Sequence, residues 1–185
     1  MYIKFLENIK QKVGDYVFKR DLKLNDRIRE VHSFHSAKSI GILYDATDLE
    51  DMMMVSEFVN ELFSQKKEVK ALGYVNLQEL THRHMPMLQF DFFFIKDLNW
   101  YYKPQNYIIS NFVEKDYDIL INLCTSNCVP VKYLLASSRA KFKVGKFEEE
   151  LKIYDLMIDV KEQSLESLIK EVKHYLTLIN KKDAS

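Results

Sequence analysis

Glycine, proline and cysteine are scarce in this chain of 185 residues, which contains 4 glycines, 3 prolines and 2 cysteines. So little glycine and proline argues against a loop-rich or disordered chain. The two cysteines, Cys124 and Cys128, are too few for a disulfide framework, and a reducing compartment is the simpler interpretation. No apolar run approaches the roughly 20 residues of a membrane-spanning helix, and the N-terminal segment 1–7 lacks an apolar signal core. We therefore expect a cytoplasmic protein.

An excess of either charge is also missing. Lys and Arg number 27 and Asp and Glu number 27, so the net charge is zero. This balance removes the overall electrostatic argument for a nucleic-acid partner. The length and the 47% hydrophobic content fit one domain over residues 1–185, with a helical extension at 1–30 and a core at 38–180.

The first 30 residues predict an amphipathic helix. Apolar side chains recur there at spacings of three and four, at Ile3, Leu6, Ile9, Val13, Tyr16 and Val17. The segment carries eight basic and five acidic residues. Because both signs occur, we favour a helix packed on its own domain or on a second copy. A helix lying on a membrane surface is the alternative.

A strand, a helix and a second strand follow in fewer than forty residues. The apolar runs 39–44 and 69–75 predict buried strands, and residues 48–66 predict the helix between them. Thr47 and Glu50 have the spacing of a capping box at the start of that helix. This βαβ unit requires parallel strands and a right-handed crossover.

The same alternation continues to the C-terminus. Further strands are predicted at 88–95, 118–123, 142–144 and 154–160, and helices at 108–114, 130–138 and from Ser164 onward. Apolar strands that alternate with helices indicate a mainly parallel sheet with helices on both faces. We predict a three-layer α/β fold, Rossmann-like or flavodoxin-like, whose strand order the sequence leaves open.

Two loops at strand ends are candidate binding segments. Asp45, Thr47 and Asp48 follow the strand at 39–45, and Thr125, Ser126 and Asn127 follow the strand at 118–123. Ligands of parallel sheets bind at these ends, where helix N-termini offer free amides to anions. If the two strands are neighbours, the loops share one crevice. The competing interpretation is that these residues are only helix caps and turns.

No complete catalytic motif is present, so enzymatic activity stays an open question. The first strand is followed by Asp45-Ala46-Thr47 without the glycines of a dinucleotide fingerprint or a P-loop. Thr47 also stands where a phospho-aspartate hydrolase would need a second aspartate. The histidines do not supply converging zinc ligands, and we predict neither a metal nor a cofactor.

Three further features each allow a purely structural interpretation and a functional one. The basic stretch from Lys132 to Lys146 is typical of a solvated edge strand, with an anionic-partner patch as the alternative. Cys128 precedes a helix, which can lower a thiol pKa, but an inert buried cysteine is favoured. The aromatic loop 100–102 is a candidate contact surface.

Several segments carry a resemblance to a known family: 96–100, 117–123, 138–145 and 154–159. Together they resemble an uncharacterised family of Bacteroidota proteins with a domain of unknown function, over about residues 39–179. The resemblance implies a bacterial cytoplasmic protein and implies no activity. Residues 117–145 also resemble the N-terminal Rossmann-like half of heptosyltransferase-type glycosyltransferases. Those enzymes hold the nucleotide sugar in a second domain that this chain is too short to contain, so this likeness concerns fold.

Two hypotheses about function follow. The first is a non-enzymatic interaction or scaffold module that acts through a protein partner or a homodimer, without nucleic acid and without a membrane span. The second is a protein or enzyme that binds a small anionic ligand, a nucleotide or a sugar phosphate, at the crevice of the two loops.

Overall fold

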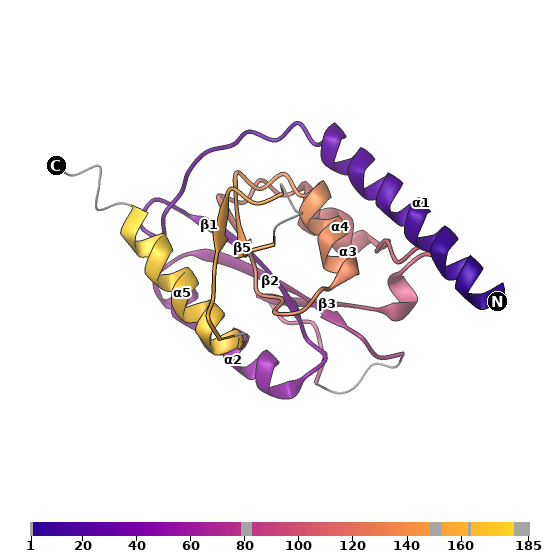
Figure 1. The fold of residues 1–185 in the computed structure, drawn as a ribbon. Coiled ribbons are helices and arrows are strands. Elements are labelled where there is room, and N and C mark those ends of the chain that lie inside the picture. The colour runs from indigo at the N-terminus through magenta and orange to yellow at the C-terminus, as the bar shows by residue number, and fades with distance from the viewer. Residues whose placement is uncertain (1, 79–82, 149–152, 163, 180–185) are drawn as a thin grey trace.

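The computed structural model describes residues 2–78, 83–148, 153–162 and 164–179 (Figure 1). Its centre is a six-stranded sheet in which every pair of neighbouring strands is parallel. The strands are β1 (Ser39–Asp45), β2 (Glu68–Val75), β3 (Phe90–Phe94), β4 (Ile119–Asn122), β5 (Phe142–Lys146) and β6 (Leu156–Ile158). The α/β prediction is confirmed.

The strand order is β3-β2-β1-β4-β5-β6. This is the order of dinucleotide-binding Rossmann folds and differs from the flavodoxin order, so the fold is Rossmann-like. The order reverses between β1 and β4, where Leu43 pairs with Asn122 and the Leu123 N–H donates to the Leu43 carbonyl at 2.8 Å. The two loops considered as binding segments therefore follow adjacent strands that point the same way.

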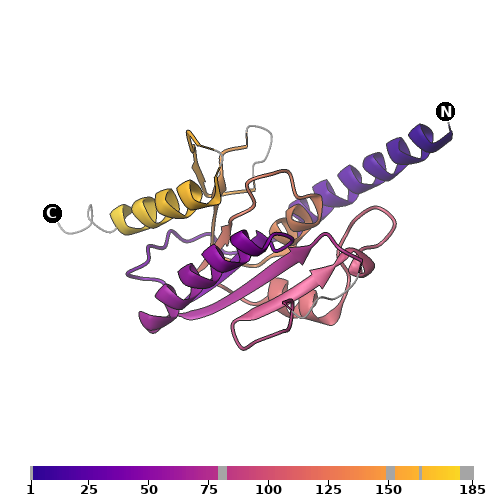
Figure 2. The ribbon, with the colours of Figure 1, turned by 90° about the horizontal axis from the view of Figure 1, so that it is seen from below.

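Helices cover both faces of the sheet (Figures 1 and 2). The helices are α1 (Tyr2–Leu24), α2 (Leu49–Ser64), α3 (Tyr107–Glu114), α4 (Val129–Ser137) and α5 (Leu165–Leu178), and a short 3₁₀ turn η1 occupies Ile95–Asp97. One buried layer joins α2 and α5 to the sheet through side chains such as Ile42 and Tyr44. The other joins α3 and α4 through Leu43 and Leu120. Each fully buried aliphatic side chain of these layers contributes about 1.5–3 kcal/mol.

Helix α1 is held against α4 by a close approach at Gly14. A β-carbon at this position would lie 2.7 Å from the Tyr133 hydroxyl, so only glycine allows this contact without a shift. Phe18 packs edge-on against the Tyr133 ring at 6.2 Å. Beyond the helix, the Asn25 amide donates to the carbonyls of Ala136 and Ser138, both at 2.7 Å. The first half of α1 extends past the sheet (Figure 2).

The start of α2 differs from the sequence prediction. Asp48 is the N-cap and its carboxylate accepts the Glu50 N–H at 2.7 Å. The Thr47 hydroxyl accepts the Asn76 N–H at 2.9 Å instead. The predicted Thr47 cap was wrong because the Thr47 hydroxyl is hydrogen-bonded to the loop that follows β2 and not to the first turn of α2. The predicted Ser164 cap of α5 is confirmed, since its side chain accepts the Ser167 N–H at 3.2 Å.

The basic stretch was also misread as an edge strand. Strand β5 lies between β4 and β6, and the Lys143 side chain is only 1% exposed. Its ammonium donates to the Leu135 carbonyl at 2.5 Å in the last turn of α4. A hydrogen-bond donor suits that position because the last carbonyls of a helix have no partner within the helix.

Candidate functional site

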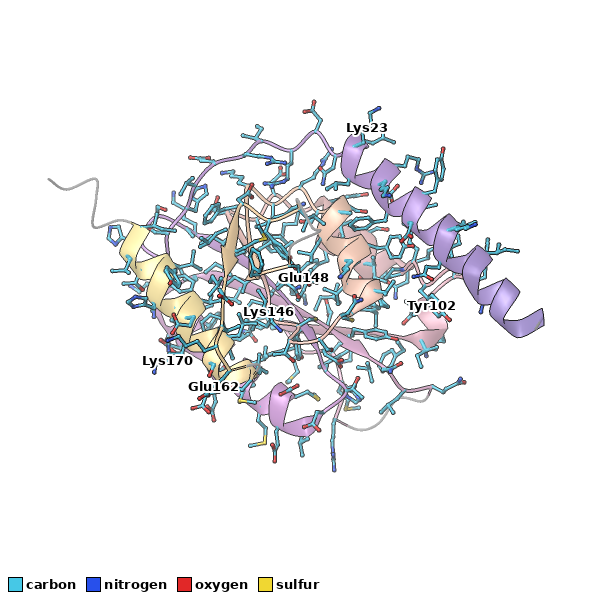
Figure 3. The ribbon with its side chains drawn as sticks, in the orientation of Figure 1. Lys23, Tyr102, Lys146, Glu148, Glu162 and Lys170 are labelled. Carbon is cyan, nitrogen blue, oxygen red and sulfur yellow. The ribbon has the colours of Figure 1, made fainter. Side chains whose placement is uncertain are left out.

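A cavity of about 990 Å³ lies between α1 and the ends of β4 and β5. Side chains from α1, the aromatic loop, α4 and the segments after β4 and β5 line it. Figure 3 shows Lys146 and Glu148 near the middle of the molecule and Tyr102 beside α1. The lining residues are Lys10, Gln11, Gly14, Asp15, Phe18, Lys19, Tyr101, Tyr102, Thr125, Ser126, Asn127, Val129, Lys132, Tyr133, Lys146, Phe147 and Glu148.

The second predicted loop forms part of this lining. Thr125, Ser126 and Asn127 all contribute, and the last two are exposed. The Lys146 ammonium donates to the Thr125 carbonyl at 3.0 Å, which joins the loop to the end of β5. The structure thus brings this loop next to a cation.

The first predicted loop is adjacent in the sheet but its polar groups serve local bonds. The Asp45 carboxylate accepts the Thr47 N–H at 2.9 Å, while Thr47 and Asp48 hold the contacts described above. Several carboxylates gather here. The pKa of Asp51 is raised by burial and by the charges of Asp48, Asp45 and Glu50. An anion would meet repulsion at this end, so the cavity is the more favourable place for one.

Four lysines face the cavity from three elements. Lys10 and Lys19 come from α1, Lys132 from α4 and Lys146 from β5. The lining has two acids, Asp15 and Glu148, so basic residues exceed acidic ones by two (4 − 2). Lys132 and Glu148 form an ion pair at 2.8 Å. Concave surfaces with one predominant charge concentrate ligands of the opposite charge.

Aromatic side chains form another wall. Tyr101, Tyr102 and Tyr133 line it together with Phe18 and Phe147. The Tyr101–Tyr102 turn is organised by Asn99, whose side-chain oxygen accepts the N–H groups of Tyr101 at 3.1 Å and Lys103 at 3.0 Å.

Within this turn, Tyr102 has a φ of 68°. A left-handed conformation costs a residue with a side chain roughly 1–2 kcal/mol, and the Asn99 bonds offset that cost. The aromatic wall is therefore built on a fixed turn.

Two thiols lie at the edge of the same region. A hydrogen bond between them raises the pKa of Cys124 and lowers that of Cys128. Burial opposes the change at Cys128, whereas the Val131 N–H and Lys132 support it. Cys128 is the N-cap of α4 and both thiols are buried. At the start of α4, the Val131 N–H already donates to the Cys128 sulfur, and Pro130 has no N–H. An anion would therefore meet positive charge mostly from the lysines.

The sequence analysis missed Asn122, a buried amide at the crossover point of the sheet. Its side-chain nitrogen donates to the Tyr154 hydroxyl at 2.7 Å, and its oxygen accepts the Cys124 N–H at 3.1 Å. It fixes the backbone from which the Thr125–Asn127 loop departs. The signal was an amide among the apolar residues of a buried strand, since such groups need bonding partners.

Lys10 and Lys19 were likewise missed as site residues. Helix amphipathicity shows that α1 has a packing face but not which element it covers. In the described part of the chain, no group of three or more His, Cys, Asp or Glu side chains is placed to hold a metal ion. No described helix combines the length and apolarity needed to cross a bilayer.

Residues 10–179 match a family of unknown function, DUF6913. The chain belongs to this family. The DUF6913 region includes all six strands and every residue that lines the cavity. No curated protein and no solved structure gave a match. The predicted membership of a family of unknown function is confirmed, while the Bacteroidota origin and the heptosyltransferase likeness stay predictions.

Proposed function

We propose that this DUF6913 protein binds a small phosphate ester in the cavity between α1 and the ends of β4 and β5. The observation that carries the proposal is the combination of four lysines and the Thr125–Asn127 loop around one space of about 990 Å³. The volume lies at the upper end of the range for small-molecule sites. Its place next to the reversal of strand order is where open parallel sheets bind ligands.

The two kinds of wall favour a ligand with two parts. Lysines from α4 and β5 attract a phosphate, and the Thr125–Asn127 side chains offer hydrogen bonds to it. The tyrosines of the same lining can pack against a base or a sugar ring. A nucleotide or a sugar phosphate meets both requirements, and inorganic phosphate meets only the first. The cavity thus moves our preference from the interaction module to the ligand-binding hypothesis.

Thermal-shift screening of the full chain tests the proposal. Nucleotides, sugar nucleotides and sugar phosphates are compared with the same sugars and nucleosides without phosphate. A bound ligand stabilises the folded state in proportion to the logarithm of its concentration over Kd, by about 2.7 kcal/mol at 100 times Kd. We expect Tm to rise with at least one phosphorylated compound and to stay constant with its dephosphorylated form.

Variants then locate the binding site. Lys132→Ala and Lys146→Ala should each weaken binding of that compound about tenfold, because each removes a charge-assisted bond. Lys170→Ala is the matched control, since this exposed lysine lies on α5 across the sheet. The proposal fails if no phosphorylated compound shifts Tm at millimolar concentration, or if the cavity variants bind as tightly as the control.

A further inference from the structure

The side of α1 that faces away from the sheet has a composition of its own. Buried Gly14 and Val17 mark the side that faces the domain. At about 100° per residue, Ile9, Lys12, Tyr16 and Lys23 lie on the opposite side. These residues are exposed, Ile9 by 37% and Tyr16 by 69%. Figure 3 shows Lys23 pointing away from the domain. We call this set of four residues the outer face of α1.

The structure separates the charges that the sequence mixes along this helix. Asp15 lines the cavity, and the Asp21 side chain is only 10% exposed and pairs with Lys103 at 2.5 Å. Both described acids of α1 are therefore turned toward the domain or its cavity. The charged residues of the outer face, Lys12 and Lys23, are basic. The sequence argument for simple packing rested on the presence of both signs of charge, and that argument does not hold for this face.

Helix α1 begins at Tyr2, about two turns before Ile9. This first half of the helix extends beyond the sheet (Figure 2). The outer face is thus a line of aromatic, aliphatic and basic residues on a helix that leaves the domain.

We propose that the outer face of α1 docks on an anionic lipid surface. A helix in the plane of a membrane pairs apolar side chains with Lys and Arg, and each Lys near an anionic leaflet contributes about 1 kcal/mol. Tyrosine suits the boundary because its ring is apolar and its hydroxyl is polar. Charge complementarity favours lipid over a second copy of the chain, because Lys12 and Lys23 of two copies would be brought together.

Sedimentation of the full chain with lipid vesicles tests this docking. We expect the protein to pellet with phosphatidylcholine vesicles that contain about 30% phosphatidylserine, and to stay in solution with pure phosphatidylcholine. About 0.5 M NaCl should release it, because the screening length falls to a few ångströms. Lys12→Glu combined with Lys23→Glu should lower the partition coefficient at least tenfold, and so should Ile9→Ser combined with Tyr16→Ser.

Two controls separate docking from misfolding. The pair Lys12→Arg and Lys23→Arg keeps both charges and should bind as the wild type does. The pair Tyr107→Ser and Lys170→Glu changes one exposed aromatic on α3 and one exposed cation on α5, and it should also leave binding unchanged. Far-ultraviolet circular dichroism checks that each variant keeps its helices.

Three results would overturn the proposal. The charge-reversed variant could pellet with anionic vesicles as fully as the wild type. The wild type could bind neutral and anionic vesicles equally. The lipid-free chain could sediment as a dimer that Ile9→Ser with Tyr16→Ser dissociates, which would assign the outer face to a second copy.

Discussion

At the scale of single residues, Asp118 ties three strands together at the amino end of the sheet. Its carboxylate accepts the N–H groups of Lys38 at 2.8 Å and Ser39 at 3.1 Å, and the Lys141 ammonium at 3.0 Å. Burial acts to raise its pKa, but these bonds outweigh burial and lower the pKa from 3.8 to about 2. The ionised form is therefore the one that stabilises the fold.

The lowered pKa of Asp118 predicts a loss of stability in acid. A carboxylate whose folded pKa is depressed contributes stability above its unfolded value of 3.8, and that contribution is lost as pH falls toward 2. Allowing for solvent screening, we expect a loss of about 1 kcal/mol from this group. Urea unfolding of the wild type and Asp118→Asn between pH 6 and pH 2.5 measures it. Equal pH dependence in the two proteins would contradict the assignment.

Lys143 predicts that stability also rises with pH above neutrality. Its pKa is lowered from 10.5 to about 7, mainly by burial and also by the charge of Arg27, while the charge of Asp155 acts to raise it. Between these values the unfolded chain binds more protons than the folded chain, so stability rises with pH. We expect a gain of about 2 kcal/mol from pH 7 to pH 9 and a flatter profile in Lys143→Met. A rise of equal slope in the variant would show that other groups cause it.

At the scale of elements, the contact between α1 and α4 shapes one wall of the cavity. It depends on Gly14, which lets the helix backbone approach the Tyr133 hydroxyl, and that hydroxyl donates to the Tyr101 carbonyl at 3.3 Å. Tyr133 thus joins α1, α4 and the aromatic turn. A shift of α1 at this point would move Lys10 and Lys19 away from the other lysines.

A double-mutant cycle tests this contact. Alanine favours a helix over glycine by about 1 kcal/mol, yet Gly14→Ala should destabilise the wild type because its methyl group meets the Tyr133 hydroxyl. In Tyr133→Phe the hydroxyl is absent, and the same alanine should be neutral or stabilising. We expect a coupling free energy of about 1 kcal/mol or more from urea unfolding. Additive effects of the two substitutions would refute the close approach.

The sequence was a good guide to these elements and a poor guide to their loops. Apolar runs located the strands within a few residues, because a strand covered on both faces must be apolar almost throughout. The helix cap was assigned to Thr47 rather than Asp48, since both residues are good caps and only the Asn76 contact distinguishes them. Lys143 was misread because a buried lysine that donates to a helix C-terminus has the same sequence pattern as an exposed lysine.

At the scale of the whole molecule, the adjacency of β1 and β4 was the step that sequence could only assume. The structure confirms it through the pairing of Leu43 with Asn122 and supplies the rest of the order. The cavity could not be predicted, because its lysines come from elements up to 136 residues apart (146 − 10). Half of the expected site, the Thr125–Asn127 loop, lines the cavity. The other half, the Asp45–Asp48 loop, lies at an acidic end of the sheet, and its role in binding a ligand stays a prediction.

The most direct test of the ligand-binding proposal is a crystal structure of the full chain with the phosphorylated compound that raises Tm most. Our account predicts that the phosphate lies within hydrogen-bonding distance of Lys132 or Lys146, with the organic part against Tyr101 and Tyr102. A phosphate bound at the Asp45–Asp48 loop, or anywhere outside the space between α1 and the ends of β4 and β5, would contradict it.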